Sequence, residues 1–299
     1  GAQAMKRQSS LRRADDRFGF ILVLPAIAVF CAIILYPFLN SLMLSFTNMN
    51  MLKPNYEVIG FRNFEKLFAD PNFGGVLTNT LIFVSGSVAL PFVLGFIWAI
   101  VLNEKFRFSE LLRGITLIDW IIPSTAIGFL WMWIFNGDYG VLNGLLRELG
   151  VIDENINFLG RTDTAMLVVI LARTWQVLPW YMAFLTGGLG GVSMDQTEAA
   201  KIDGANNWLI FRHVVLPAMS PIVGLILLQG TIGALQHFDL IWVMTAGGPA
   251  RATMTLSMEV YLNAFKSWKI GMAASVGVVW IVFLAVFSFI YIRKNMREI

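Results

Sequence analysis

Charged residues and cysteine are scarce in this sequence. Only 14% of the residues are Asp, Glu, Lys or Arg, whereas soluble domains carry about 25%, so the polar shell of a water-soluble globule is missing. The single Cys31 excludes an intrachain disulfide, and two histidines are too few for a His-rich metal site. Hydrophobic residues make up 57% of the chain, and the charges gather in short stretches between long uncharged runs. The composition indicates an integral membrane protein.

The net charge of +3 does not point to nucleic acid. The basic residues lie at the ends of the apolar runs, where membrane topology accounts for them. We therefore expect membrane lipid, and no nucleic acid, around this chain.

Six runs are apolar and long enough to cross a bilayer, which takes roughly 20 helical residues. They lack the alternating polarity of β-barrel strands. The first is too long for a signal-peptide core and has no small-residue cleavage site after it, so it is expected to stay as a span. The sequence predicts an all-α membrane protein with six transmembrane helices, at residues 18–40, 76–102, 114–135, 164–189, 220–245 and 271–292.

Lysine and arginine are divided unequally between the two sides of the membrane. Thirteen lie in the two tails and in the loops 103–113 and 190–213, and eight lie in the three opposite loops. The positive-inside rule makes the richer side cytoplasmic, so both termini are expected there. The membrane domain then spans 18–292, between a basic N-terminal tail at 5–17 and a C-terminal tail at 293–299.

The chain ends and the loops add two expectations. Residues 1–4, Gly-Ala-Gln-Ala before Met5, are expected to be a cloning remnant. The longest loops, 47–75 and 136–163, are too short to fold as domains. The chain is therefore expected to depend on a partner for its energy.

The connector between the fourth and fifth spans, residues 190–217, has the pattern of two short helices. Asp195, with Glu198 three residues later, fits a capping box. Asp203 and Gly204 predict a turn with Gly204 at positive φ, and a second helix should start near Asn206 or Asn207. Its buried face is predicted to hold Trp208, Phe211 and Val215, and it leads through Pro217 and Pro221 into the fifth span.

This connector resembles the EAA motif of the inner-membrane permease subunits of bacterial ABC importers. The matching positions are Glu198, Ala199, Ala200, Asp203, Gly204, Ala205, Phe211 and Pro217. Two further stretches, GFRNF at 60–64 and FDLIWVMTAGGP at 238–249, resemble the sugar-type branch of maltose, glycerol-phosphate and multiple-sugar permeases. The resemblance covers most of the chain from residue 20 onward.

The resemblance implies a multi-pass permease of the bacterial inner membrane with the type I ABC importer fold, and not an enzyme. The solute is expected to be a carbohydrate or sugar-like molecule: a neutral di- or oligosaccharide, a polyol, or a phosphorylated or sulfonated sugar. The implied partners are a second permease subunit in a heterodimer, two ATPase subunits and a periplasmic or extracellular solute-binding protein. The chain itself is expected to bind no cofactor or metal, because the ATPases use ATP and Mg²⁺. The segment from Glu198 to Ala205 is expected to couple the permease to an ATPase.

Polar residues of the fifth predicted span are candidates for the substrate path. Gln229, Gly233, Gln236 and His237 fall at i, i+4, i+7 and i+8, which places them on one helical face. Glycine there leaves room, and the amides offer hydrogen bonds to sugar hydroxyls. The same residues also suit helix packing, since glycine permits close approach and glutamine bonds across helices.

On the fourth predicted span, Gln176 and Trp180 share a face, with Arg173 one turn earlier. Trp180 suits stacking on a pyranose ring, and equally suits interfacial packing. A cation inside the hydrocarbon needs a partner, so we expect Arg173 to pair with Asp239 or to meet an anionic group of the solute. Asp119 is expected to snorkel to the cytoplasmic edge.

Two other function classes leave characteristic patterns. An ion-coupled secondary transporter, the main alternative, typically has inverted repeats with broken helices. A membrane enzyme typically carries an HExxH, Gly-x-Ser-x-Gly or paired acidic element. Neither pattern is visible in the sequence.

Overall fold

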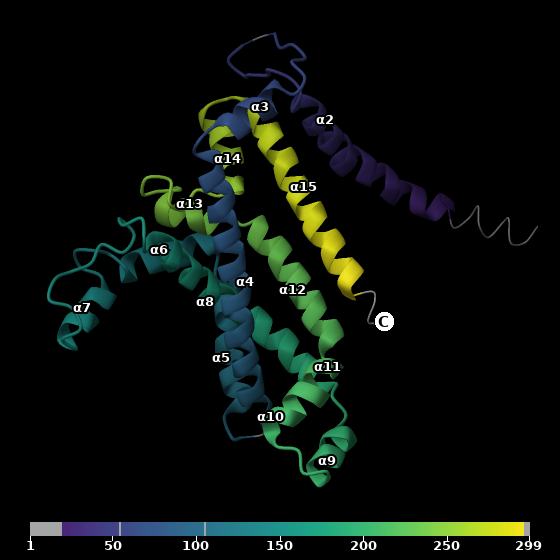
Figure 1. The fold of residues 1–299 in the computed structure, drawn as a ribbon, viewed down its shortest axis with the longest axis vertical. Helices are drawn as coiled ribbons and strands as arrows, with labels where there is room; N and C mark the ends of the chain where they lie inside the picture. Colours follow the sequence, from purple (N-terminus) through teal and green to yellow (C-terminus); the bar gives the residue numbers. More distant parts are fainter. Residues whose placement is uncertain (1–19, 54, 105, 296–299) are drawn as a thin grey trace, which may run out of the picture.

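The computed structural model describes residues 20–53, 55–104 and 106–295, which form an elongated helical bundle (Figure 1). Within these residues the only β pairing is an isolated antiparallel bridge between Thr47 and Val58. The predicted all-α class is confirmed. The expected cloning remnant at 1–4 and the basic tail at 5–17 lie outside the described residues, as do residues 296–299 of the C-terminal tail.

Within the described residues, four helices are long and apolar enough to cross a membrane. The first, Phe20–Leu44, includes the π-helical turn η1 (Cys31–Leu35) and α2 (Tyr36–Leu44). The others are α4 (Phe73–Asn103), α8 (Ala165–Gly190) and α15 (Ile270–Asn295). They correspond to four of the six runs predicted from the sequence.

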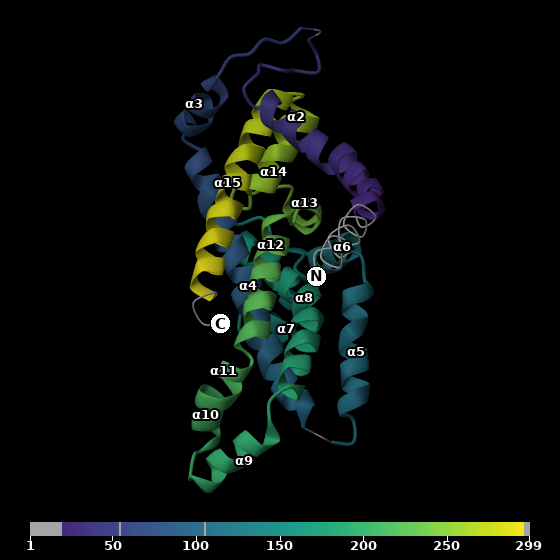
Figure 2. The ribbon, with the colours of Figure 1, turned by 90° about the vertical axis from the view of Figure 1, so that its right-hand side faces the viewer.

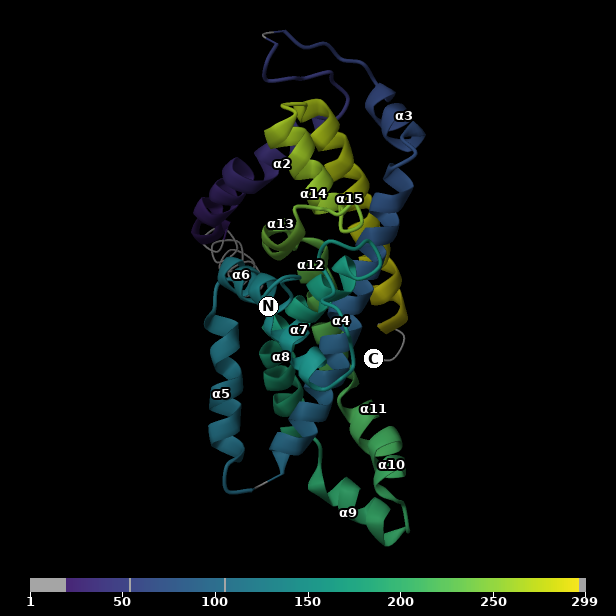
Figure 3. The same cartoon turned by 90° about the vertical axis from the view of Figure 1, so that its left-hand side faces the viewer.

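The third predicted span is two helices instead of one. α5 (Ser109–Ile121) and α6 (Ser124–Ile134) meet at 100°, and Figures 2 and 3 show α6 lying across one end of α5. Pro123 explains the break, because proline disfavours a helical residue before it, and Ile122 is extended with ψ 129°. The continuous helix 114–135 is therefore wrong. Asp119 lies in the last turn of α5, and its snorkelling to the cytoplasmic edge stays a prediction.

The fifth predicted span ends early. α12 (Ser220–Leu235) stops at Leu235, and α13 (Asp239–Thr245) is a separate helix, so the continuous span 220–245 is wrong. The last turn tightens, since the His237 amide donates to the carbonyl of Ala234. The free carbonyl of His237 accepts a 2.9 Å hydrogen bond from the Ser257 hydroxyl. A tertiary contact therefore satisfies the backbone where the helix ends.

Shorter helices cap the two ends of the bundle. Figures 1 and 2 show α9 and α10 at one end and α3 and α14 at the other, with α4 running most of the distance between them. The segment Asn207–Ala218 bends by 71° from α12. The bounds are α3 (Arg62–Ala69), α7 (Val141–Glu148), α9 (Met194–Ile202), α10 (Asn207–Ile210), η2 (Phe211–Val215), α11 (Leu216–Ala218), α14 (Leu256–Tyr261) and η3 (Leu262–Lys266).

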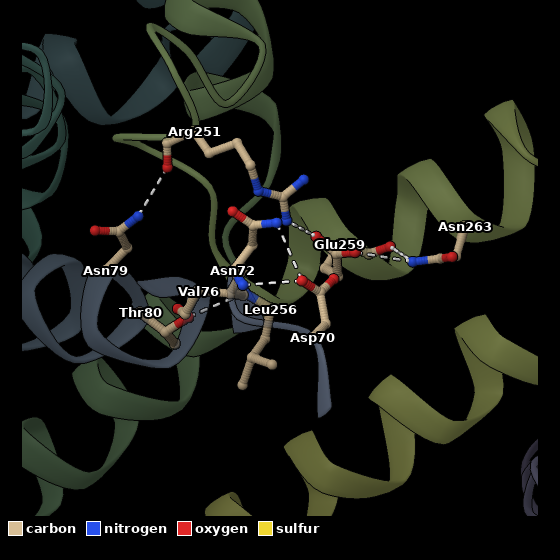
Figure 4. A network of polar contacts seen from close by, with 9 residues as sticks. All are labelled: Asp70, Asn72, Val76, Asn79, Thr80, Arg251, Leu256, Glu259 and Asn263. Carbon is tan, nitrogen blue, oxygen red and sulfur yellow. Dashed lines mark hydrogen bonds and ion pairs between the residues drawn. The ribbon is translucent and has the colours of Figure 1, made fainter. Parts of the chain in front are cut away.

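At the end away from α9, a polar network holds the segment around α14 against α4 (Figure 4). Arg251 Nη2 forms a 2.6 Å ion pair with Glu259 Oε2. The side chain of Asn79 on α4 donates to the carbonyl of Arg251 at 2.9 Å. The hydroxyl of Thr80, also on α4, accepts from the Leu256 amide at 3.0 Å. The first residue of α14 therefore donates a hydrogen bond to α4.

Replacing Thr80 by valine is expected to lower the thermal stability of the purified protein. Thr80 is 3% exposed, so the variant leaves the buried Leu256 amide without its acceptor, at a cost of about 1–3 kcal/mol. Thr78 is the matched control, because its exposed hydroxyl bonds only to Gly74 of its own helix. Unfolding of both variants in the same detergent compares them, and equal melting temperatures would show that the Thr80 contact is dispensable.

Candidate functional site

A cavity of about 460 Å³ lies between α4, the α5–α6 break, α8 and α12. Its volume is in the range of small-molecule pockets, about 300–1,000 Å³. Ser87, near the midpoint of α4, places the cavity halfway along the longest helix. Its other lining residues are Trp120, Ile121, Ile122, Pro123 and Ser124 at the break, Arg173, Gln176, Val177, Trp180 and Tyr181 on α8, and Gln229, Gly230 and Gly233 on α12.

Five of the seven predicted path residues line this one cavity: Arg173, Gln176, Trp180, Gln229 and Gly233. They come from two helices that the sequence alone does not place side by side. The helical spacing on α8 is as predicted, because residues three and four apart share a face.

Gln236 and His237 do not line this cavity. α12 ends at Leu235, so the one-face spacing does not extend to them. Gln236 instead lines a second cavity of about 410 Å³ beside α14 and α15. His237 stacks on Phe83, with ring centroids 6.2 Å apart. Their role in a substrate path stays a prediction.

A chain of hydrogen bonds joins α8 to the α5–α6 break. Arg173 Nη1 donates to Gln176 Oε1 at 2.7 Å, and Gln176 Nε2 donates to Ser124 Oγ at 2.7 Å. Of the two alternatives for Arg173, the ion pair with Asp239 is not formed among the described residues, and the contact with an anionic group of the solute stays a prediction. Asp239 begins α13 and is exposed, and the ion pairs among the described residues are Arg161–Asp163 and Arg251–Glu259.

Three lining residues have buried polar atoms without a hydrogen-bond partner among the described residues: Ser87 Oγ, Arg173 Nε and the Tyr181 hydroxyl. Gly230 faces Tyr181 so closely that a Cβ there would overlap the hydroxyl. Sequence reasoning missed Ser87, Tyr181 and Gly230. Tyr181 was within reach, because it lies eight residues after Arg173 and so shares its helical face.

The connector after α8 folds into two short helices, as predicted. Gly204 has φ +83°, and the Asn206 side chain caps α10 by accepting from the Leu209 amide at 2.9 Å. Two details are wrong. Ser193, not Asp195, is the N-cap of α9, and no side chain caps it. Trp208 is 63% exposed instead of buried, and Phe211 and Val215 are half-buried.

No residue of α9 is buried, although Thr197 and Ala200 are half-buried. Met194, Glu198 and Ile202 fall at i, i+4 and i+8 and form one face. Met194 is 74% exposed and Ile202 is 86% exposed. We refer to Met194, Glu198 and Ile202 as the α9 face. Sequence reasoning singled out Glu198 and missed the two apolar residues beside it.

Comparison with known proteins identifies the family of this chain. The family model described as "Binding-protein-dependent transport system inner membrane component" matches residues 91–294. The chain belongs to this family. It is therefore a multi-pass permease of the inner membrane in an ABC import system, and not an enzyme.

Two relatives match the permease over nearly its full length. It is 35% identical to the lactose transport system permease protein of Rhizobium radiobacter, over 96% of this chain and 97% of that protein. It is 30% identical to the trehalose/maltose transport system permease protein of Thermococcus litoralis, over 95% of this chain and 96% of that protein.

A solved structure shares the fold of the permease. A chain of a bacterial ABC transporter involved in alginate import superposes with a TM-score of 0.81 at 20% identity, covering 98% of this chain and 99% of that chain. The match shows the ABC importer permease fold for the bundle in Figure 1.

Proposed function

We propose that this permease carries a carbohydrate across the membrane through the cavity between α4, α8 and α12. The observation that carries the proposal is the position of the cavity. It lies halfway along α4, at the depth of the hydrocarbon, and is lined by polar and aromatic side chains. Polar groups at that depth are costly and usually face a solute or water. The names of the lactose and trehalose/maltose relatives support a sugar as the solute.

The chemistry of the lining suits a sugar. Gln229 offers an amide donor and acceptor to hydroxyl groups, and Trp180 offers a flat apolar surface to the C–H face of a pyranose. Gly233 has nothing within 4 Å of where its Cβ would be, so it keeps the cavity wide.

The proposed topology counts each bent helix pair as one crossing, which gives six crossings and two cytoplasmic termini. α9, α10, the C-terminal end of α4 and the N-terminal end of α5 lie at the same end of the bundle (Figure 2). The basic residues of loops 103–113 and 190–213 support a cytoplasmic assignment for that end.

The proposed assembly contains a second, related permease subunit, two ATPase subunits and a periplasmic or extracellular solute-binding protein. In it, the α9 face docks onto an ATPase, which alone uses ATP and Mg²⁺. Movement of α9 then rocks the spans and opens the cavity to one side at a time. The exposed apolar residues of the α9 face support this docking, because exposed apolar groups rimmed by polar residues mark contact sites.

Filling the cavity is expected to stop uptake. Gly233→Phe places a benzyl group in the cavity without a backbone clash, since nothing lies within 4 Å of the Gly233 Cβ position. Gly187→Phe is the matched control, because Gly187 on α8 also has open space around it and does not line the cavity. Both are compared as complete transporters in vesicles supplied with binding protein and a radiolabelled sugar.

The expected result is loss of nearly all ATP-driven uptake in Gly233→Phe and near-normal uptake in Gly187→Phe, with equal ATPase association. Normal uptake in Gly233→Phe would place the path elsewhere. Uptake that needs an ion gradient and no ATPase would instead indicate a secondary transporter.

A further inference from the structure

We infer that the cavity recognises a saccharide carrying an anionic group, and that Arg173 holds that group. The inference rests on the proposed function, since it names the class of sugar that the same cavity takes.

Arg173 lines the cavity, and the described residues leave part of its hydrogen-bonding capacity unused. A guanidinium carries five N–H donors and stays protonated. In the structure it makes one side-chain hydrogen bond, from Nη1 to the neutral amide oxygen of Gln176 at 2.7 Å. Its Nε is buried and has no partner among the described residues. Gln176 orients the guanidinium without neutralising its charge.

Among the residues that the structure describes, no acidic side chain lines the cavity. Asp119 directly precedes the lining segment 120–124, and Asp239 begins α13, yet neither forms an ion pair with Arg173 in the part of the chain that the structure describes. A positive charge halfway across the bundle is costly without a counter-charge. We therefore assign the negative charge that balances Arg173 to the solute.

Neighbouring groups complete an arrangement rich in donors. Tyr181 and Ser87 line the same cavity, and their hydroxyl oxygens are buried without a partner among the described residues. A guanidinium only donates, so the matching ligand group must accept several hydrogen bonds, which an oxyanion does best. Trp120 and Trp180 line the cavity as well and supply apolar surface for the sugar ring.

Carboxylate, sulfonate and phosphate groups share this acceptor chemistry, and four probes separate them: glucose, glucuronate, 6-deoxy-6-sulfoglucose and glucose 6-phosphate. The permease, assembled with its partner subunits in nanodiscs and without binding protein, is titrated with each probe. Tryptophan fluorescence reports binding, because Trp120 and Trp180 line the cavity.

We expect at least one anionic probe to bind at least about tenfold more tightly than glucose, with a preference that weakens as salt is added. Arg173→Met should lower the affinity for that probe to the level of glucose. Gln229→Met is the matched control, because it removes a polar group from the same cavity without changing charge. It should weaken all probes alike and keep the preference.

Equal affinity of the unmodified protein for glucose and all three anionic probes would overturn the inference, whatever the stability of the variants. A preference that survives in a folded Arg173→Met variant would overturn the role of Arg173. Gly233→Phe separates the two levels of the proposal. If the unmodified protein binds glucose and the anionic probes equally and Gly233→Phe prevents the binding of all of them, only the anion inference fails. If it blocks no probe, the proposed path fails with it.

Discussion

Replacing Glu198 by lysine is expected to abolish ATP-driven uptake while the membrane-spanning part of the permease stays folded. Glu198 is exposed, and its side chain has no hydrogen bond or ion pair within the described residues. The charge reversal therefore disturbs no packing inside this chain. At an interface with an ATPase, an unpaired buried charge costs about 2–5 kcal/mol, which is enough to release the ATPase or uncouple it. Uptake, ATP hydrolysis and ATPase co-purification are measured on the same preparation.

Gln196→Lys is the control for this experiment. Gln196 is exposed on the same helix, two residues from Glu198 and so on nearly the opposite face. It should retain both uptake and ATPase association. If Glu198→Lys transported as well as Gln196→Lys, the α9 face would not be the coupling surface.

Replacing Gly95 by alanine is expected to destabilise the bundle by about 1–3 kcal/mol, the usual cost of overpacking. A Cβ at Gly95 would lie 2.8 Å from the Cβ of Tyr181 and 3.2 Å from the backbone nitrogen of Met182. These atoms belong to the backbone of α8 or lie next to it, so a rotamer change cannot relieve the clash. α4 and α8 must then separate, which also displaces Tyr181 from the cavity wall.

Gly114→Ala tests the same substitution without the clash. Gly114 is an exposed residue of α5 with nothing within 4 Å of its Cβ position, and alanine favours a helix over glycine. Thermal unfolding in detergent and sugar binding are measured for both variants. We expect a lower melting temperature and weaker binding for Gly95→Ala only. Equal behaviour of the two variants would mean that α4 and α8 do not pack as closely as described.

Local sequence patterns determined the features that depend on a few neighbouring residues. Long apolar runs predict the helices, because a helix satisfies its own backbone in lipid. The turn at Gly204 and the cap at Asn206 follow from the conformational freedom of one residue and the side-chain oxygen of the other. The break before Pro123 belongs with them. Pro123 itself is the signal in the sequence, but the apolar residues on both sides of it favour one continuous span.

Only the tertiary structure decided where α12 ends and which residues share the cavity. Residues 235–238 contain no proline or glycine. The helix ends where the hydroxyl of Ser257, twenty residues later in the chain, donates a hydrogen bond to the carbonyl of His237. For this reason the helical spacing wrongly placed Gln236 and His237 on the same face as Gln229. The same continuous helix underlay one of the two alternatives for Arg173, the pair with Asp239, because it carried the fifth span through residue 239. Periodicity places residues on a face of one helix, whereas the partner of that face depends on how separate helices pack.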